Sequence, residues 1–346
     1  MSDNKKVAVL GGGSFGTVLA NLAASNGFEV KLWVRDADQA LRINSEGTNT
    51  TYHPELKLSD NITASEDLGS VVMDARYVLV ATPSIIFEEV ITRLEPLISS
   101  ASAVISCTKG IKAEPFRTMT DIIHQHLGHI IDNKIGVLSG PNLAKEIADE
   151  KIAGTVIASK NEAINVDIKS ILSSDTFKVF SSQDIQGVEL AGALKNIYAI
   201  CCGIAHAKSV GENALGFIVT RSMAEMSRFA VAKGANPITF LGLAGMGDLM
   251  ATCTSRLSRN FQLGELIAKD ISLLDAKDQV GQVAEGARTL EVVYHEAIKM
   301  NVSMPLVSSL YKILYSDFSS DELIQDLLDH PNEVDVEFTY KENHYE

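Results

Sequence analysis

The sequence has few cysteines, four in 346 residues, and none of them forms a C-x-x-C pair or a cysteine and histidine spacing that is typical of zinc sites. We therefore expect neither disulfide bonds nor a metal site, and buried thiols are the better interpretation. The sequence also lacks any run of about 18 apolar residues without a charge, and its N-terminus leads directly into a strand rather than into a signal peptide. These absences predict a cytoplasmic protein that does not insert into a membrane.

Positive charge is also scarce, because 30 lysine and arginine residues stand against 44 aspartate and glutamate residues and leave a net charge of −14. Nucleic acids and anionic membrane surfaces both require a basic patch, so neither is an expected partner. An anionic ligand must instead be bound by a few local cations. With 46% hydrophobic residues, a chain of this length can bury a large core and is expected to divide into two domains.

A glycine-rich turn near the N-terminus organises the first half of the chain. The apolar run 7–10 predicts a strand, residues 17–25 predict a helix, and Gly11, Gly13 and Gly16 fit the spacing G-x-G-x-x-G. In dinucleotide-binding folds, the first glycine permits the sharp turn, the second lets a pyrophosphate approach the backbone, and the third lets the helix pack closely on the strand. The N–H groups of the first helical turn then face the phosphates. The alternative is a glycine turn with a structural role only.

The end of the second predicted strand, 29–34, bears on the choice of cofactor. NAD-selective folds place an acidic residue about 20 residues after the glycines, where it binds the ribose 2′-hydroxyl, whereas an arginine accommodates a 2′-phosphate. Here Arg35 comes first and Asp36 follows. We interpret this order as tolerance of NADP, with NAD as the second cofactor. The alternative is an ordinary solvated pair of charges in a loop.

Several further strands are predicted to end in polar or turn residues, and amphipathic helices separate them, which is the pattern of repeated β-α-β units. The predicted strands are 77–81, 103–106, 136–139, 154–159 and 177–181, and the predicted helices are 87–98, 116–127 and 162–172. In a doubly wound parallel sheet, ligands bind at the edge where the strands end. Lys109 and Asn142 follow two of these strands and are expected near the nicotinamide end of the cofactor, although a lysine in a loop is commonly only solvated.

Strand signals cease near Asp184, and from there to Gly234 most residues are good helix formers. The sequence therefore predicts an α/β fold with a Rossmann-like, doubly wound and mostly parallel sheet over residues 1–183, followed by an all-α domain over residues 184–346. The first domain is expected to bind a dinucleotide, and the second to carry catalytic and substrate-binding residues.

Lys195 lies in a strongly apolar part of the first of these helices. Lysine is rarely buried without a partner, so we expect an ion pair or a chemical role, unless the side chain reaches the surface. Burial favours the neutral form of an amine, which suits Lys195 to exchange a proton with a substrate oxygen. His206 is the competing proton donor on the same helix face, roughly 16 Å away in an unbroken helix. Asp248 opens a short predicted helix, where it either caps that helix or neutralises a buried ammonium such as Lys195.

The next predicted helix begins with Ser258, Arg259 and Asn260, which combine a hydroxyl cap, a planar cation and an amide. A helix start of this kind is suited to bind an anion, and Arg259 can bind a phosphate with two parallel hydrogen bonds. Arg256 is the alternative ligand of that phosphate.

These residues belong to a set of motifs by which the chain resembles the bacterial type of NAD(P)-dependent glycerol-3-phosphate dehydrogenase. The motifs occur in the expected order and are GGGSFGT (11–17), SCTKGI (106–111), LSGPNLAKEIA (138–148), ELAGALKNIYAI (189–200), GLAGMGDLMATCTSRLSRN (242–260) and VAEG (283–286). The resemblance implies reduction of dihydroxyacetone phosphate to sn-glycerol 3-phosphate for glycerophospholipid biosynthesis, with NADP or NAD as cofactor, commonly by a homodimer.

The resemblance also implies roles for individual residues, and it identifies Lys195 with the catalytic lysine of the family. The implied substrate contacts are Lys109, Gly140, Asn142, Lys195, Asp248, Ser258, Arg259 and Asn260. The implied cofactor contacts are Gly11, Gly13, Ser14, Phe15, Gly16, Arg35, Lys109, Ala144, Arg259, Val283 and Glu285. The chain departs from the family at Asn142, where bacterial members often have serine or threonine, and its last residues, 338–346, match no pattern of the family.

The residues and the resemblance predict the same mechanism. Arg259, with Ser258 and Asn260, holds the substrate phosphate while the carbonyl faces the nicotinamide in a cleft between the domains. Lys195, as an ammonium oriented by Asp248, stabilises and protonates the developing alkoxide. Two other functions stay open at this point: a dinucleotide sensor without catalysis, and a dehydrogenase of another small hydroxy acid.

Overall fold

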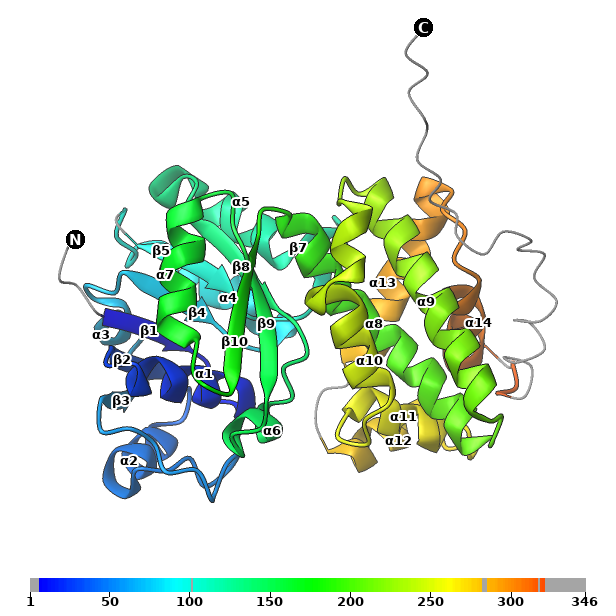
Figure 1. Ribbon diagram of the computed structural model, residues 1–346, viewed down its shortest axis with the longest axis horizontal. Coiled ribbons are helices and arrows are strands. Elements are labelled where there is room, and N and C mark those ends of the chain that lie inside the picture. The colour runs from blue at the N-terminus through cyan, green and yellow to red at the C-terminus, as the bar shows by residue number, and fades with distance from the viewer. Residues whose placement is uncertain (1–5, 101, 282–284, 317, 321–346) are drawn as a thin grey trace, which may run out of the picture.

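The computed structural model describes residues 6–100, 102–281, 285–316 and 318–320. Figure 1 shows two parts that follow one another along the chain, a sheet flanked by helices and then a bundle of helices. The sheet ends with β10 (Phe177–Ser182), and the bundle begins with α8 (Ile185–Ala207). The predicted fold class is therefore confirmed.

Eight strands form the main sheet, in the order β10-β9-β8-β5-β4-β1-β2-β3. Their bounds are β1 (Lys6–Leu10), β2 (Glu29–Trp33), β3 (Ile62–Ser65), β4 (Tyr77–Val80), β5 (Ala103–Ser106), β8 (Ile135–Ser139), β9 (Ala153–Ala158) and β10 (Phe177–Ser182). The strands from β8 to β3 run parallel to their neighbours. The loops that follow β1, β4, β5 and β8 therefore meet at one edge of the sheet, as the sequence predicts.

The sheet is not parallel throughout, because β9 pairs antiparallel with β8. A parallel return requires a crossover of about a dozen residues or more, usually through a helix packed on the sheet. The connection from β8 to β9 contains only the short α6 (Ala144–Ala148), whereas α7 (Glu162–Leu172) makes a full crossover and leaves β10 parallel to β9.

Helices cover both faces of the sheet, and the alternation of β1 shows why. Val7 and Val9 pack with residues of α1 and α7 on one face, whereas Ala8 and Leu10 pack with residues of α3, α4 and α5 on the other. A strand that is buried on both faces has apolar residues at consecutive positions, and residues 7–10 show this pattern. The remaining elements of this part are α1 (Ser14–Ser25), α2 (Ala37–Glu46), α3 (Leu68–Val72), α4 (Ser84–Leu94), α5 (Met119–Ile131) and the hairpin of β6 (Ile111–Lys112) and β7 (Arg117–Thr118).

The helix predicted over 162–172 is confirmed as α7, whereas two other predicted helices start three residues away from the observed ones. The helix predicted from 87 begins at Ser84, directly after Pro83. The helix predicted from 116 begins at Met119, because Thr118 caps it in a reciprocal capping box with Asp121. That box is a local signal, since a threonine is followed three residues later by an acid that reaches back to the cap.

The helical part is built around α8, which is almost completely buried and packs against α9, α10, α11, α13 and α14. By length and composition α8 would be able to cross a membrane, but its apolar stretch is wholly enclosed by the protein, as in a core helix. The other elements are α9 (Glu212–Ala232), η1 (Pro237–Leu241), η2 (Leu243–Gly247), α10 (Asp248–Cys253), α11 (Arg259–Ile267), α12 (Leu273–Val280), α13 (Glu285–Met300) and α14 (Pro305–Tyr315).

Two glycines bring α8 and α11 into backbone contact. A Cβ atom at Gly203 would overlap the carbonyl oxygen of Phe261, and one at Gly264 would overlap that of Ile200. The crossing therefore admits no side chain at either point. It fixes the start of α11 relative to the middle of α8, and these are the two places where the sequence predicts a phosphate ligand and a catalytic lysine.

Helix α8 also packs closely against the part of the fold that contains the sheet. Glu189 of α8 is only 3% exposed and accepts hydrogen bonds from the backbone N–H (2.9 Å) and the hydroxyl of Thr120 at the start of α5. Burial raises the pKa of Glu189 to about 7. One turn further along α8, a Cβ at Gly192 would overlap the hydroxyl oxygen of Ser139 at the end of β8. The two parts of the fold thus meet along α8.

Candidate active site

The glycine turn between β1 and α1 has the geometry that the motif predicts. Gly11 has φ +122°, and a Cβ there would lie 2.6 Å from the carbonyl oxygen of Ala81. A Cβ at Gly16 would overlap the carbonyl oxygen of Gly11, so that the helix can pack closely on the strand only without a side chain. At Gly13, by contrast, a Cβ would have no neighbour within 4 Å. The space beside Gly13 is therefore open, which fits the close approach of a dinucleotide phosphate.

The end of β2 presents Arg35 to solvent, one residue before Asp36. Asp36 caps α2, because its Oδ1 accepts a hydrogen bond from the backbone N–H of Asp38 at 2.9 Å. Within the described part of the chain, Arg35 forms no ion pair. The guanidinium is thus available to a 2′-phosphate, while the neighbouring carboxylate is partly engaged in capping.

The ends of β5 and β8 bring two of the predicted residues together. Lys109 donates a hydrogen bond from Nζ to the carbonyl oxygen of Gly140, at 3.0 Å. Asn142 lies beside them and donates from Nδ2 to Thr155 Oγ1 at 3.0 Å. Because the single hydroxyl hydrogen of Thr155 is donated to the carbonyl oxygen of Ser139 (3.1 Å), its oxygen accepts from the Asn142 amide. The Asn142 carbonyl then points away from Thr155 and has no partner among the described residues.

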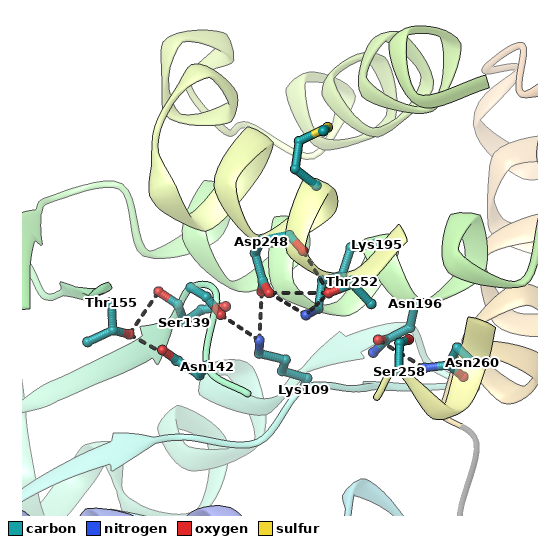
Figure 2. A network of polar contacts seen from close by, with 12 residues as sticks. Lys109, Ser139, Asn142, Thr155, Lys195, Asn196, Asp248, Thr252, Ser258 and Asn260 are labelled. Carbon is teal, nitrogen blue, oxygen red and sulfur yellow. Dashed lines mark hydrogen bonds and ion pairs between the residues drawn. The ribbon is translucent and has the colours of Figure 1, made fainter. Parts of the chain in front are cut away.

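Lys195 is buried, 6% exposed, and its ammonium is paired with Asp248. It also donates a hydrogen bond to Thr252 Oγ1 at 2.6 Å, and Figure 2 shows both partners directly beside Nζ. The carboxylate of Asp248 is 1% exposed, and α10 has no side-chain cap at its start. Of the two roles predicted for Asp248, the geometry therefore shows neutralisation of a buried ammonium and not capping.

Asp248 has a second cationic partner in Lys109, whose Nζ lies 2.6 Å from Oδ2. Burial lowers the pKa of Lys109 to about 7; the nearby charge of Lys195 lowers it as well, and Asp248 acts in the opposite direction. The inner end of the site thus holds two amines and one carboxylate. The amines outnumber the carboxylate, so a group that develops negative charge beside them would be stabilised when both amines are protonated.

His206, the competing proton donor, is engaged elsewhere. Its Nδ1 lies 3.2 Å from a carboxylate oxygen of Glu265, and its ring packs against Phe261. Both partners belong to α11. Among the described residues, no group of three or more histidine, cysteine, aspartate and glutamate side chains is arranged to hold a metal ion.

The start of α11 forms the opposite wall of the site. Ser258 caps the helix by accepting a hydrogen bond from the backbone N–H of Phe261 at 3.3 Å, as predicted. Partial burial lowers the pKa of the Arg259 guanidinium from its usual value. Asn260 donates from Nδ2 to Asn196 Oδ1, at 3.0 Å, which ties this helix start to the residue that follows Lys195. The start of α11 is therefore held against the helix that carries Lys195.

A cleft of about 500 Å³ runs between the glycine turn and α11. The predicted residues that line it are Gly13, Ser14, Phe15, Lys109, Asn142, Ala144, Arg259 and Glu285. Gly11, Gly16, Arg35, Gly140, Lys195, Asp248, Ser258 and Asn260 are not part of its lining. A larger hollow of about 850 Å³ lies over β9 and β10 and contains none of the predicted site residues.

Glu285 lines the cleft and joins α13 to the start of α4, because its carboxylate accepts hydrogen bonds from the backbone N–H (3.2 Å) and the hydroxyl (2.7 Å) of Ser84. Val283, the other cofactor contact predicted in this segment, lies outside the described residues.

Three residues that contact the site are not predicted from the sequence: Thr252, Asn196 and Ser84. A local feature of the sequence would have indicated each of them. Thr252 follows Asp248 by four residues on the same helix, and residues with that spacing share a helix face. Asn196 directly follows Lys195, and Ser84 is the first residue of a helix at the ligand edge of the sheet.

Two family models match the chain. That of the NAD-dependent glycerol-3-phosphate dehydrogenase N-terminus matches residues 6–165, and that of the NAD-dependent glycerol-3-phosphate dehydrogenase C-terminus matches residues 184–325.

Individual proteins are similar over almost the whole length. Glycerol-3-phosphate dehydrogenase (NAD(P)+) of Alcanivorax borkumensis is 48% identical over 336 residues, which is 97% of each chain. The enzyme of the same name from Teredinibacter turnerae is 46% identical over 95% of this chain and 96% of its own. The crystal structure of glycerol-3-phosphate dehydrogenase from Coxiella burnetii superposes with a TM-score of 0.88 at 34% identity, and the match covers 94% of this chain and 99% of that chain.

Proposed function

The chain belongs to the NAD-dependent glycerol-3-phosphate dehydrogenase family, and from that premise we propose that it reduces dihydroxyacetone phosphate to sn-glycerol 3-phosphate with NADPH or NADH. The product is a precursor of glycerophospholipids. One observation carries the proposal: the buried Lys195 is paired with Asp248, and Asp248 also binds Lys109, which lines the cleft together with Gly13 and Arg259.

The cofactor, when bound, supplies a hydride to the substrate carbonyl carbon. Gly13 and Ser14 would hold its pyrophosphate, and Arg35 would bind the 2′-phosphate of NADPH. The open space beside Gly13 and the exposed guanidinium of Arg35 support these assignments.

The substrate phosphate would lie at the start of α11, where Arg259 can donate two parallel hydrogen bonds. Ser258 and Asn260 complete this site in the proposal. The carbonyl oxygen would then face Lys195, which donates its proton as the alkoxide forms. Asp248 orients the ammonium through the ion pair, and in the reverse direction the neutral amine accepts the proton from the substrate hydroxyl.

Comparison of dihydroxyacetone phosphate with unphosphorylated dihydroxyacetone tests the proposal. We expect NADPH oxidation with the phosphate ester and little with the free ketone, because the helix start binds the anion. Equal turnover of the two ketones would overturn the assignment of the phosphate site. Tight NADPH binding without oxidation by any phosphorylated ketone would indicate a dinucleotide sensor instead.

We further propose that the dinucleotide-binding domain comprises residues 1–183 and the catalytic domain residues 184–346, and that the enzyme acts as a homodimer in the cytoplasm. The end of β10 at Ser182 supports the proposed boundary between the two domains. The four cysteines are free and buried, which supports a location in a reducing compartment such as the cytoplasm. The homodimer rests on the family resemblance, and light scattering of the purified protein tests it.

A further inference from the structure

His53 contacts the residue that begins α1. Its side chain is buried, with the residue 6% exposed, and its Nε2 lies 2.9 Å from the hydroxyl oxygen and 3.0 Å from the carbonyl oxygen of Ser14. His53 itself does not line the cleft, whereas Ser14 does. The imidazole thus reaches the cofactor side only through the serine.

The two distances fix the direction of these hydrogen bonds. A carbonyl oxygen can only accept, so Nε2 must carry a hydrogen to lie 3.0 Å from the Ser14 carbonyl. This holds for the neutral ring in the Nε2–H form and for the protonated ring alike. Because Nε2 is then a donor, the Ser14 hydroxyl oxygen beside it can only accept from it, and the hydroxyl hydrogen must point elsewhere.

We propose that His53 is a positioning residue of the dinucleotide site, which turns the Ser14 hydroxyl into a hydrogen-bond donor to the cofactor pyrophosphate. A phosphate oxygen carries no hydrogen at neutral pH, so only a donor at this place binds it. Without His53, the hydroxyl hydrogen can be donated to a protein acceptor instead. The inference rests on the proposed function only in requiring that a dinucleotide occupies the glycine turn.

The position of Ser14 favours this role. It is the first residue of α1, and the preceding Gly13 provides no side-chain cap, so the N–H groups of the first turn are left to an external acceptor. A Cβ at Gly13 would have no neighbour within 4 Å, so the space in front of these groups is open.

The segment that carries His53 is itself attached to the same turn. Asn49, 1% exposed, donates from Nδ2 to the carbonyl oxygen of Gly12 (3.0 Å) and to Thr17 Oγ1 (2.8 Å). Gln39 donates to the same Gly12 carbonyl at 2.8 Å, and the backbone N–H of His53 donates to the carbonyl of Asn49 at 2.8 Å. Asn49 thus attaches the segment that carries His53 to the glycine turn, which keeps the imidazole beside Ser14.

Fluorescence titration of NADPH in the absence of ketone tests the inference on the whole chain. We expect Ser14→Ala to raise the Kd for NADPH roughly tenfold, since one hydrogen bond to a charged group is lost. His53→Leu is expected to raise it several-fold, and His53→Gln to restore most of the affinity, because the glutamine amide can donate where Nε2–H did. In steady state, His53→Leu should raise the KM for NADPH and leave kcat and the KM for dihydroxyacetone phosphate unchanged.

The double variant separates this role from simple support of the backbone. If His53 acts through the hydroxyl, His53→Leu has almost no further effect on Kd in the Ser14→Ala background. An equal rise in both backgrounds, an unchanged Kd for His53→Leu, or a glutamine variant as weak as the leucine variant would each overturn the inference. NADPH binding without reduction of dihydroxyacetone phosphate would refute the proposed function alone, whereas a chain that binds neither NADPH nor NADH would refute both.

Discussion

Lys109 and Lys195 bind the two oxygens of one buried carboxylate, that of Asp248. Lys109 comes from the end of β5 and Lys195 from the middle of α8, so the shared carboxylate joins the two parts of the fold at the inner end of the site (Figure 2). Two amines around one carboxylate leave a net positive charge when both are protonated. That excess is what a developing alkoxide requires.

Replacement of Lys195 by alanine tests the proton donor. We expect kcat with dihydroxyacetone phosphate to fall by about 10²–10⁴-fold, the usual contribution of general acid catalysis, with the Kd for NADPH unchanged. Steady-state assays and NADPH titration measure the two quantities. His206→Ala is the matched control and should retain activity close to that of the wild type. Substantial turnover by Lys195→Ala, or its loss in His206→Ala, would contradict the assignment.

We expect kcat/KM to depend on pH through Lys109, because burial lowers the pKa of this lysine to about 7. As the pH rises through this value, Lys109 loses its proton and its attraction for the anionic substrate. We expect the ratio of kcat/KM between the wild type and Lys109→Gln to decrease from about pH 6 to about pH 9. The ratio cancels the ionisation of the substrate phosphate, which is common to both proteins. A ratio that does not vary with pH would show that the charge of Lys109 does not act on the substrate.

Arg259→Lys keeps the positive charge at the start of α11 but removes the planar pair of donors. We expect the KM for dihydroxyacetone phosphate to rise about tenfold, because a lysine cannot form two parallel hydrogen bonds with a phosphate. Arg256 is exposed and lies outside the cleft lining, so Arg256→Lys should leave this KM unchanged. The reverse result would transfer the phosphate site to Arg256.

Arg35→Ala tests the choice of cofactor. The exposed guanidinium at the end of β2 is expected to bind the 2′-phosphate, so its removal should raise the KM for NADPH roughly tenfold and leave the KM for NADH nearly constant. Assays with both cofactors, on the wild type and the variant, measure the change. A similar effect on both values would mean that Arg35 does not distinguish them.

Glu189 predicts a pH dependence of stability. Its pKa is raised from 4.5 to about 7, so the folded state holds the proton more tightly than the unfolded state. This contribution is complete below the unfolded pKa and is lost as the pH rises through about 7. Relative to the wild type, the free energy of unfolding of Glu189→Gln should therefore increase from about pH 5 to pH 8, by about 1–3 kcal/mol. Urea denaturation measures it, and a constant difference would contradict the prediction.

Much of this architecture could be predicted from the sequence because the relevant signals are local. The roles of Gly11 and Gly16 follow from a motif of six residues, and the geometry of both is confirmed. Lys195 stands out because a charge interrupts an apolar helix, and the structure does bury it against Asp248. Its catalytic role stays a prediction.

The features of the fold and the site that could not be predicted depend on contacts between residues that are far apart in the sequence. The pairing of Lys109 with Asp248 joins residues 139 positions apart, and the bond between His53 and Ser14 spans 39 positions. No periodicity or composition encodes such pairs. The antiparallel direction of β9 was likewise not apparent, because strand propensity does not indicate direction.

Gly192 has a consequence for any change of sequence at this point. The absence of a side chain lets α8 rest directly on Ser139, and even one added methyl group would act as a spacer between the sheet and the bundle. The lysine one turn further along the helix would then withdraw from the cofactor side by the thickness of that spacer. In the proposed mechanism, the alignment of hydride and proton transfer is therefore set partly by a residue that has no side chain.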